Sequence, residues 1–373
     1  ISSPSVADGI VYVGSQDRNL YAIGAWSGNL IWKFTTLSTI ESSPAVANGK
    51  VFTGGDDGYV YCLDAYKGTL FWKTFVNGNL PATFSTIELR SSPTVSKNML
   101  YVGSLDGHLY ALNINNGEII WKFKTEGLIT SSPAVAEGAV YITSQEPTTG
   151  ALYKIEADSG RLIWKKTLPY NSVFTGGTDM FGSPSVADGI IFASSNLREY
   201  YGINATTGET IWTFTNPHAI EFIYSSPIYV NGQLFIINKF DITCLNATNG
   251  RTIWSAFTGD ELYVSPSYAD GKIYVVTTER HIYILDAKNN GTKIASFTTP
   301  SSSFSSPTLS YGRLYIGNND WNVYCLTNYI TYEENPMPEQ DQTSEYIPLI
   351  VAIIVVIVTM LIVIAYVSKK AKY

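Results

Sequence analysis

Tyr61-Cys62-Leu63-Asp64-Ala65-Tyr66-Lys67-Gly68-Thr69-Leu70-Phe71-Trp72 is one copy of a stretch that recurs along this chain of 373 residues. It joins an apolar run to a second apolar run through a turn that ends in glycine. Two runs rich in aromatic and aliphatic residues on either side of such a turn predict a pair of antiparallel strands. The tryptophan returns at the end of five further copies: Trp32, Trp121, Trp164, Trp212 and Trp254.

A second marker precedes each of these stretches and gives the number of repeats. A proline preceded by serine occurs eight times, at Pro4, Pro44, Pro93, Pro133, Pro184, Pro227, Pro266 and Pro307. A period of about 42 residues suits one four-stranded propeller blade. The chain is therefore predicted to be all-β, an eight-bladed β-propeller of four-stranded antiparallel blades.

Two residue types assign the edges of each predicted blade. Proline cannot donate a ladder hydrogen bond, so the strand that it opens is expected at the inner edge. Lysine discourages pairing between sheets, and Lys33, Lys73 and Lys122 directly follow the tryptophans, which places that strand at the outer edge. We call the four strands A to D, from the channel outward.

The last two copies depart from the pattern. The seventh has Ile294 or Ala295 where tryptophan is expected, so a weaker contact between blades is predicted there. In the eighth, Asn335 and Pro336 stand where strand D would run, which predicts a last blade that lacks its outer strand.

The repeated motif resembles the tryptophan-docking motif of quinoprotein-type propellers, which carry pyrroloquinoline-quinone-like repeats, and the resemblance covers residues 1–327. Among these the chain is similar to the propeller lipoproteins of outer-membrane protein assembly. The resemblance implies that each docking tryptophan packs between adjacent blades, consistent with the large area that an indole buries.

The C-terminal region predicts a membrane anchor. Residues 328–345 contain Pro336, Pro338 and five acidic residues and are expected to be an extended linker. Residues 346–368 form an uncharged apolar segment long enough for a transmembrane helix, the alternative being a buried core helix. The basic tail 369–373 then lies in the cytoplasm and the propeller outside the cell membrane. Since such a domain needs an export signal and the sequence opens at Ile1, residues before it are expected to be missing.

The composition narrows the classes of partner. A formal net charge of −7 offers no basic field for phosphates, so nucleic acid is not expected as a partner. Cys62, Cys244 and Cys325 lie far apart, which indicates buried apolar residues and neither a disulfide framework nor a zinc site.

One face of the propeller is predicted to carry recognition. The connections D–A and B–C emerge on the same face, and the lengthened segments Val76–Arg90, Leu168–Met180 and Gln145–Gly150 all belong to them. A ring of residues at the channel mouth is expected there: Ile1, Glu41, Arg90, Thr130, Phe181, Tyr224, Tyr263 and Phe304. Such a ring suits a flat ligand, a sugar or a peptide, or it fills the gaps between blades.

Catalytic and metal-binding residues are not predicted. The related dehydrogenases need pyrroloquinoline quinone, calcium held by carboxylate and amide groups, an aspartate base and adjacent cysteines, and this sequence has no Cys-Cys pair. His108, His218 and His281 lack metal-ligand spacing and are expected in turns or at the surface. Asp56-Asp57-Gly58 suits turn geometry.

The function that these features favour is a membrane-anchored scaffold without a cofactor, which binds another envelope protein or a surface polymer. The alternatives are a membrane-bound dehydrogenase that uses pyrroloquinoline quinone with calcium, and a carbohydrate-binding surface protein that depends on Tyr224 and Tyr263. Asn204, Asn246 and Asn290 begin N-glycosylation acceptor patterns, although asparagine also suits the turns in which they lie.

Overall fold

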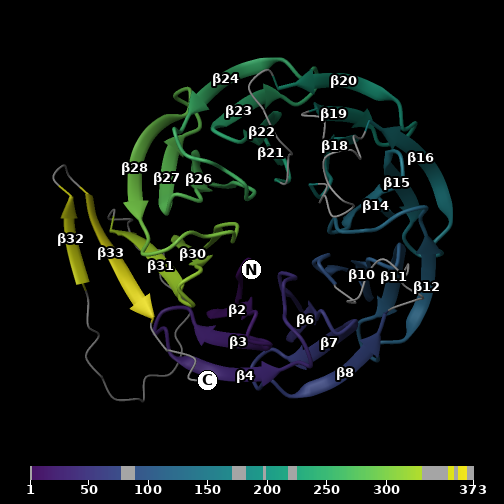
Figure 1. Ribbon diagram of the computed structural model, residues 1–373, viewed down its shortest axis with the longest axis horizontal. Coiled ribbons are helices and arrows are strands. Elements are labelled where there is room, and N and C mark those ends of the chain that lie inside the picture. Colours follow the sequence, from purple (N-terminus) through teal and green to yellow (C-terminus); the bar gives the residue numbers. More distant parts are fainter. Residues whose placement is uncertain are drawn as a thin grey trace.

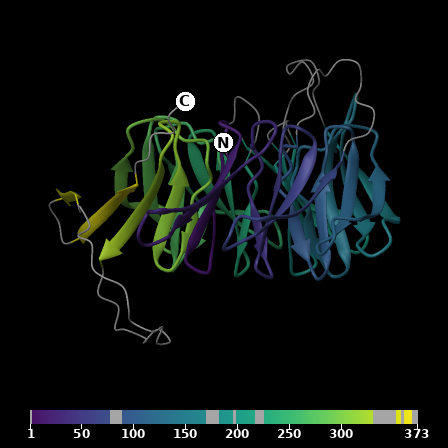
Figure 2. The ribbon, with the colours of Figure 1, turned by 90° about the horizontal axis from the view of Figure 1, so that it is seen from below.

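The computed structural model of the chain describes residues 2–76, 89–169, 182–195, 199–216, 225–329, 352–356 and 360–367. Eight antiparallel sheets stand radially around a channel, each adjacent to the next (Figure 1). Seen edge-on, they form a disc (Figure 2). The predicted eight-bladed all-β propeller is thereby confirmed. We number the blades one to eight along the chain.

The inner half of every blade consists of strands A and B. The A strands are β1 (Ser5–Ala7), β5 (Ala45–Ala47), β9 (Thr94–Ser96), β13 (Ala134–Ala136), β17 (Ser185–Ala187), β21 (Ile228–Val230), β25 (Ser267–Ala269) and β29 (Thr308–Ser310). The B strands are β2 (Ile10–Gly14), β6 (Lys50–Gly54), β10 (Met99–Gly103), β14 (Ala139–Gln145), β18 (Ile190–Ser194), β22 (Gln233–Asn238), β26 (Lys272–Val276) and β30 (Arg313–Gly317). Each A strand begins directly after its proline, as predicted.

The outer half consists of strands C and D. The C strands are β3 (Asn19–Gly24), β7 (Tyr59–Asp64), β11 (His108–Asn113), β15 (Gly150–Glu156), β19 (Glu199–Asn204), β23 (Asp241–Asn246), β27 (His281–Asp286) and β31 (Val323–Tyr329). In blades one to seven the D strands are β4 (Leu30–Thr35), β8 (Leu70–Phe75), β12 (Ile119–Lys124), β16 (Leu162–Leu168), β20 (Thr210–Thr215), β24 (Thr252–Phe257) and β28 (Thr292–Thr298). They run along the circumference in Figure 1.

The repeated Ser-Pro pairs form hydrogen bonds around the channel. Ser43 Oγ accepts from the backbone N–H of Ser3 at 3.0 Å, and Ser3 Oγ accepts from Ser306 N–H at 2.9 Å, which joins blade eight to blade one. Five more bonds of this kind follow the ring: Ser43 to Ser92, Ser92 to Ser132, Ser132 to Ser183, Ser183 to Ser226 and Ser226 to Ser265. The serine is therefore repeated because it satisfies an inner-edge N–H of the preceding blade.

The hydrophobic core lies at the seams between neighbouring blades. Eight clusters of buried residues each combine side chains from two adjacent blades. The cluster between blades eight and one has four buried members among the described residues, Val11, Ala25, Tyr315 and Cys325, whereas the others have seven to eleven. Here Trp26 and Tyr311 add an aromatic contact, with ring centroids 5.3 Å apart.

A bulge aims each docking tryptophan inward. In blade two Cys62 pairs with Trp72 and Leu63 pairs with Leu70, so that Phe71 is the additional residue of strand β8. A bulge re-aims the neighbouring side chains, and Trp72 is buried while Phe71 is half exposed. The same register shift in blade seven pairs Ile284 with Ala295, so alanine occupies the indole position there.

Blade eight differs from the prediction. Strand β33 (Met360–Val367) pairs along β31 from Val323↔Val367 to Tyr329↔Leu361, and β32 (Ala352–Val356) pairs with β33. The expectation that this blade lacks an outer strand is therefore wrong. The free backbone groups at the edge of β31 attract a partner strand, and a segment rich in valine and isoleucine suits that role.

The same two strands lie within 346–368, where a transmembrane helix was expected. Among the residues that the structure describes, no helix is long and apolar enough to cross a membrane. The linker 328–345, apart from the end of β31, and the tail 369–373 lie outside the described residues.

Candidate recognition surface

The face formed by the D–A and B–C connections is held together by contacts between neighbouring blades. Asp56 N–H, in the B–C turn of blade two, donates to Thr39 O in the preceding D–A loop at 2.8 Å. Leu37 N–H of that loop also donates to Asp57 Oδ2 at 3.0 Å. Thr278 and Asn319 make equivalent bonds to Glu261 and Ser302, so the described D–A loops and B–C turns of this face are interlocked.

The predicted ring at the channel mouth is only partly described. Phe181 and Tyr224 lie outside the described residues, as does Ile1, whereas Thr130 is half-buried. Glu41 and Arg90 come together as an ion pair, with 3.9 Å between Arg90 Nε and Glu41 Oε2. Glu41 Oε1 also accepts from Gln16 Nε2 at 3.2 Å, which links blades one, two and three at the mouth.

The aromatic members Tyr263 and Phe304 also meet. Their ring centroids are 6.5 Å apart and their planes are inclined by 56°, and Phe304 is 48% exposed. Tyr263 Oη donates to Glu261 Oε2 at 3.1 Å, and Glu261 Oε1 lies 3.2 Å from Lys239 Nζ. An aromatic pair beside an ion pair therefore stands at the mouth between blades six and eight.

A series of carboxylates around this face was missed in the sequence. In seven blades a strand C tyrosine donates to an acidic side chain: Tyr21 to Asp17, Tyr61 to Asp57, Tyr110 to Asp106, Tyr153 to Glu146, Tyr201 to Glu199, Tyr283 to Asp260 and Tyr324 to Asp320. In four of them the tyrosine follows the aspartate by four residues. That Asp-x-x-x-Tyr spacing was the signal available in the sequence.

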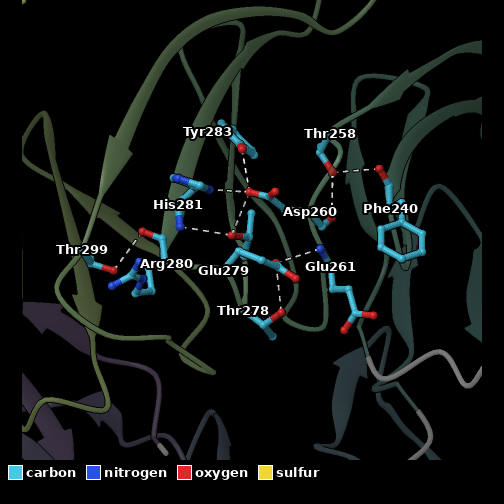
Figure 3. Close-up of polar contacts among 11 residues, drawn as sticks. Phe240, Thr258, Asp260, Glu261, Thr278, Glu279, Arg280, His281, Tyr283 and Thr299 are labelled. Carbon is cyan, nitrogen blue, oxygen red and sulfur yellow. Dashed lines mark hydrogen bonds and ion pairs between the residues drawn. The ribbon is translucent and has the colours of Figure 1, made fainter.

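Blade seven has a cluster of this kind with several connected polar groups (Figure 3). Asp260 Oδ2 accepts from Tyr283 Oη at 2.6 Å and lies 2.5 Å from His281 Nδ1. Burial alone would raise the pKa of Asp260, but the hydrogen bonds from Tyr283 and His281 and the charge of His281 outweigh it, so the pKa is lowered. The carboxylate remains ionised and ties the D–A loop to the B–C turn of the same blade.

The adjoining residues complete that connection. Glu279 Oε2 accepts from Glu261 N–H at 2.9 Å and from Thr278 Oγ1 at 3.1 Å. Thr278 N–H donates to Glu261 O at 3.0 Å. Figure 3 shows these groups converging between the loop and the turn.

His108 and His281, expected in turns or at the surface, are instead the half-buried first residues of strands β11 and β27, where they contact carboxylates. His108 Nδ1 lies 3.1 Å from Asp106 Oδ2 in blade three, at the place that His281 has in blade seven. Burial lowers the pKa of His108; the charge of Asp106 opposes this, and Lys124 adds to it. His218 lies outside the described residues.

The tryptophans bind the carbonyl groups of neighbouring blades. Trp32 Nε1 donates to Ala65 O at 2.8 Å, and its ring covers Gly68, where a Cβ would lie 2.6 Å from the indole. Four other indoles make the same bond: Trp72 to Ile114, Trp121 to Ala157, Trp212 to Ala247 and Trp254 to Ala287. Trp164 Nε1 is buried without a partner among the described residues.

The asparagines of the three acceptor patterns are placed differently. Asn204 Oδ1 accepts from the N–H groups of Thr206 and Thr207, and Asn246 Oδ1 accepts from Thr248 N–H and Oγ1. Asn290 is exposed, with φ of 52°. Its side chain is the most accessible of the three.

The chemistry of the described residues gives no metal site. No group of three or more His, Cys, Asp or Glu among them is placed to hold a metal ion. Cys62, Cys244 and Cys325 are buried and free. Burial raises the pKa of both Cys62 and Cys244 to about 12, so these thiols stay protonated.

Eight radial sheets with indoles at their seams define a β-propeller built from pyrroloquinoline-quinone-like repeats. A family model described as "Outer membrane protein assembly factor BamB" matches residues 2–124, 56–166 and 106–328. The chain belongs to this family.

Sequence identity between the chain and individual relatives is low. Tetrathionate hydrolase of Acidithiobacillus ferrooxidans is 26% identical over 186 residues, which are 42% of this chain and 35% of that protein. BamB of Yersinia pestis is 26% identical over 132 residues, 34% of this chain and 31% of that protein. The matches thus span about a third of either relative. The crystal structure of BamB from Moraxella catarrhalis superposes with a TM-score of 0.70 at 17% identity, covering 89% of this chain and 96% of that one.

The quinone cofactor of related propellers does not fit the described part of the mouth. Such a site needs several carboxylate and amide oxygens on one calcium ion, yet the described mouth residues form two ion pairs, Glu41–Arg90 and Glu261–Lys239, and one aromatic pair. Glu41 is engaged by Arg90 and Gln16. We therefore derive no chemical step through this cofactor.

Proposed function

We propose that the chain is a membrane-anchored extracytoplasmic scaffold that binds another envelope protein through its D–A and B–C face, without catalysis. The observation that carries the proposal is the contact between the half-buried Tyr263 and the exposed Phe304 on a face of interlocked turns. Exposed aromatic side chains on a preorganised surface are typical anchors of protein interfaces.

Family membership supports an assembly role. The family model and the Yersinia pestis relative are both described as outer membrane protein assembly factors. A propeller suits such a role because its turns present a broad surface on a rigid ring. The partner, by this proposal, is a protein of the cell envelope, and a surface polymer is the other outcome.

The anchor is the second part of the proposal. The uncharged apolar run within 346–368 is long enough to cross a bilayer, and the lysines of the tail favour a cytoplasmic end. The residues of the same run form strands β32 and β33 in the structure. A single chain cannot use them to cross the membrane and to extend blade eight at the same time. The chain should stay in the membrane fraction after alkaline carbonate extraction, and truncation after residue 345 should release it. Extraction of the full chain by carbonate would contradict the anchor.

Glycosylation offers an independent test of the outward location. Among Asn204, Asn246 and Asn290, the exposed Asn290 is the acceptor that we expect to be modified most completely. Mass spectrometry of peptides from the native protein measures this directly. A glycan on any of the three supports an extracytoplasmic propeller.

Photo-cross-linking tests the binding face. A photoreactive amino acid is placed at position 41, 90 or 304 on the proposed face, or at the exposed positions 115, 158 and 206 in the C–D turns of the opposite face. After irradiation of intact envelopes, we expect one protein adduct from the first set and none from the second. Adducts from the second set alone, or from neither, would overturn the proposal.

The dehydrogenase alternative has its own experiment. Adding pyrroloquinoline quinone with calcium to the purified chain should give no dye reduction with alcohols or sugars. The similarity to tetrathionate hydrolase adds a second assay, in which the chain should leave tetrathionate unchanged. Activity in either assay would show that the chain is an enzyme.

A further inference from the structure

We propose that Tyr263, Phe304 and Trp321 form one anchor site, here called the mouth arc, for an extended protein segment with an apolar residue flanked by basic residues. The inference rests on the proposed function, because it names where on the D–A and B–C face the partner binds and by which chemistry.

The first support is the backbone of Trp321, in the B–C turn of blade eight. Its φ is 69°, a left-handed conformation that is costly for a bulky side chain. Equivalent turns in blades two and three have Gly58 and Gly107, with φ of 80° and 79°. The fold therefore accepts glycine at this place, and does not require an indole.

The second support is exposure. Trp321 is 64% exposed and Phe304 is 48% exposed. By contrast, five of the six docking tryptophans are buried and Trp164 is half-buried, and Trp26 on the opposite face packs against Tyr311. Two large apolar side chains of blade eight thus face solvent where other blades have Glu41, Arg90, Arg18 or glycine.

The third support is that loop and turn are joined. Asn319 N–H donates to Ser302 O at 3.0 Å, and Asn319 Nδ2 donates to Ser302 Oγ at 2.9 Å. Ser302 and Phe304 share one loop, and Asn319 and Trp321 share one turn. Phe304 also contacts Tyr263, so the loop and the turn place the three aromatic residues on the same face of neighbouring blades.

The charged residues around the mouth arc favour one kind of bound segment. The D–A loops and B–C turns of blades seven and eight contain Asp260, Glu261, Glu279 and Asp320; the bases beside them are Arg280 and Lys239 of blade six, which pairs with Glu261. Asp260 is held ionised by its hydrogen bonds. Acidic groups around aromatic anchors favour a segment with lysine or arginine beside its apolar residue.

Peptide display tests this site. Random dodecapeptides on phage are selected on the full-length chain in detergent, with no depletion on any variant. We expect enrichment of an aromatic or leucine residue flanked by lysine or arginine. Such peptides should bind Trp321→Gly and Phe304→Glu at least tenfold more weakly than the unmodified chain, and binding should weaken as salt rises.

Two controls keep the result interpretable. Trp321→Gly should melt within a few degrees of the unmodified chain, because glycine occupies this turn in blades two and three. Trp26→Asn, which introduces the residue found at position 115, should bind the peptides unchanged. Equal binding to Trp321→Gly, selection of acidic peptides, or Trp321-dependent binding on a glycan array in place of peptides would overturn the mouth arc.

The two proposals fail separately. Protein adducts from positions 41 and 90, together with peptide binding that ignores Trp321, would keep the recognition face and reject the mouth arc. Adducts confined to positions 115, 158 and 206 would reject the recognition face itself.

Discussion

Lys154 Nζ donates a hydrogen bond of 2.7 Å to the carbonyl oxygen of Ala205, at a position that accepts an indole N–H at other seams. In the seam between blades three and four, for example, Ala157 O accepts from Trp121 Nε1 at 2.9 Å. In the seam between blades four and five, where Lys154 donates to Ala205 O, Trp164 Nε1 and Tyr141 Oη are buried without partners among the described residues.

Removing that lysine should restore the usual bond. In Lys154→Ala, which has the residue of Ala22 and Ala111 at this register, Trp164 can donate to Ala205. Trp164→Phe should then cost about 1 kcal/mol in the Lys154→Ala background and close to nothing in the unmodified chain. Urea unfolding of the four proteins measures this coupling. Equal costs in both backgrounds would show that Lys154 does not compete with the indole.

Trp121→Ala should reduce the free energy of unfolding by about 3–5 kcal/mol, because it empties a buried seam and leaves Ala157 O without its indole donor. Trp26→Ala is the matched control, since Trp26 is 44% exposed and should cost much less. Thermal melting separates the two. A shift of under a few degrees for Trp121→Ala would contradict the role of the indole between blades.

The stability of the propeller should depend on pH through His108. Burial holds the pKa of the folded ring below its ordinary value of 6.5. In the unfolded chain the ring takes up its proton near pH 6.5, so its contribution is complete above that pH and is lost as the pH falls toward the folded pKa. His108→Gln should lose less stability than the unmodified chain between about pH 7 and pH 5. The same dependence of the free energy of unfolding on pH in both proteins would exclude this role.

The three cysteines should be unreactive in the folded protein. All are buried, and burial raises the pKa of each thiol, in Cys62 and Cys244 to about 12. A thiol reagent at pH 8 should titrate none of them in the native state and three in urea. Rapid labelling of the native protein would show that a seam opens readily.

Much of the fold could be predicted because the same blade pattern occurs eight times in the sequence. The serine before each proline is repeated for a reason now visible, since Ser43 Oγ and its equivalents accept from the preceding blade. In the seventh copy the sequence left open whether Ile294 or Ala295 takes the place of tryptophan, and the structure puts Ala295 there. Such local patterns can be predicted from the sequence because every blade packs against its neighbours in the same way.

The remaining features depend on contacts between distant residues. The pairing of β33 with β31 could not be read from the sequence, because a run of valine and isoleucine suits both a strand and a membrane helix. The left-handed backbone of Trp321 was equally hidden, since tryptophan gives no turn signal. Of the mouth ring, the sequence predicted Glu41, Arg90, Tyr263 and Phe304, but it gave no sign of the exposed Trp321 in the turn of blade eight.

The most direct measurement compares one tyrosine substitution on each face. The affinity of the propeller for the envelope protein cross-linked through position 41 or 90 is determined for Tyr263→Ala and, on the opposite face, for Tyr66→Ala. We expect Tyr263→Ala to raise the Kd at least tenfold, about 1.4 kcal/mol, and Tyr66→Ala to leave it unchanged. A Kd that rises for Tyr66→Ala and stays constant for Tyr263→Ala would place recognition on the other face.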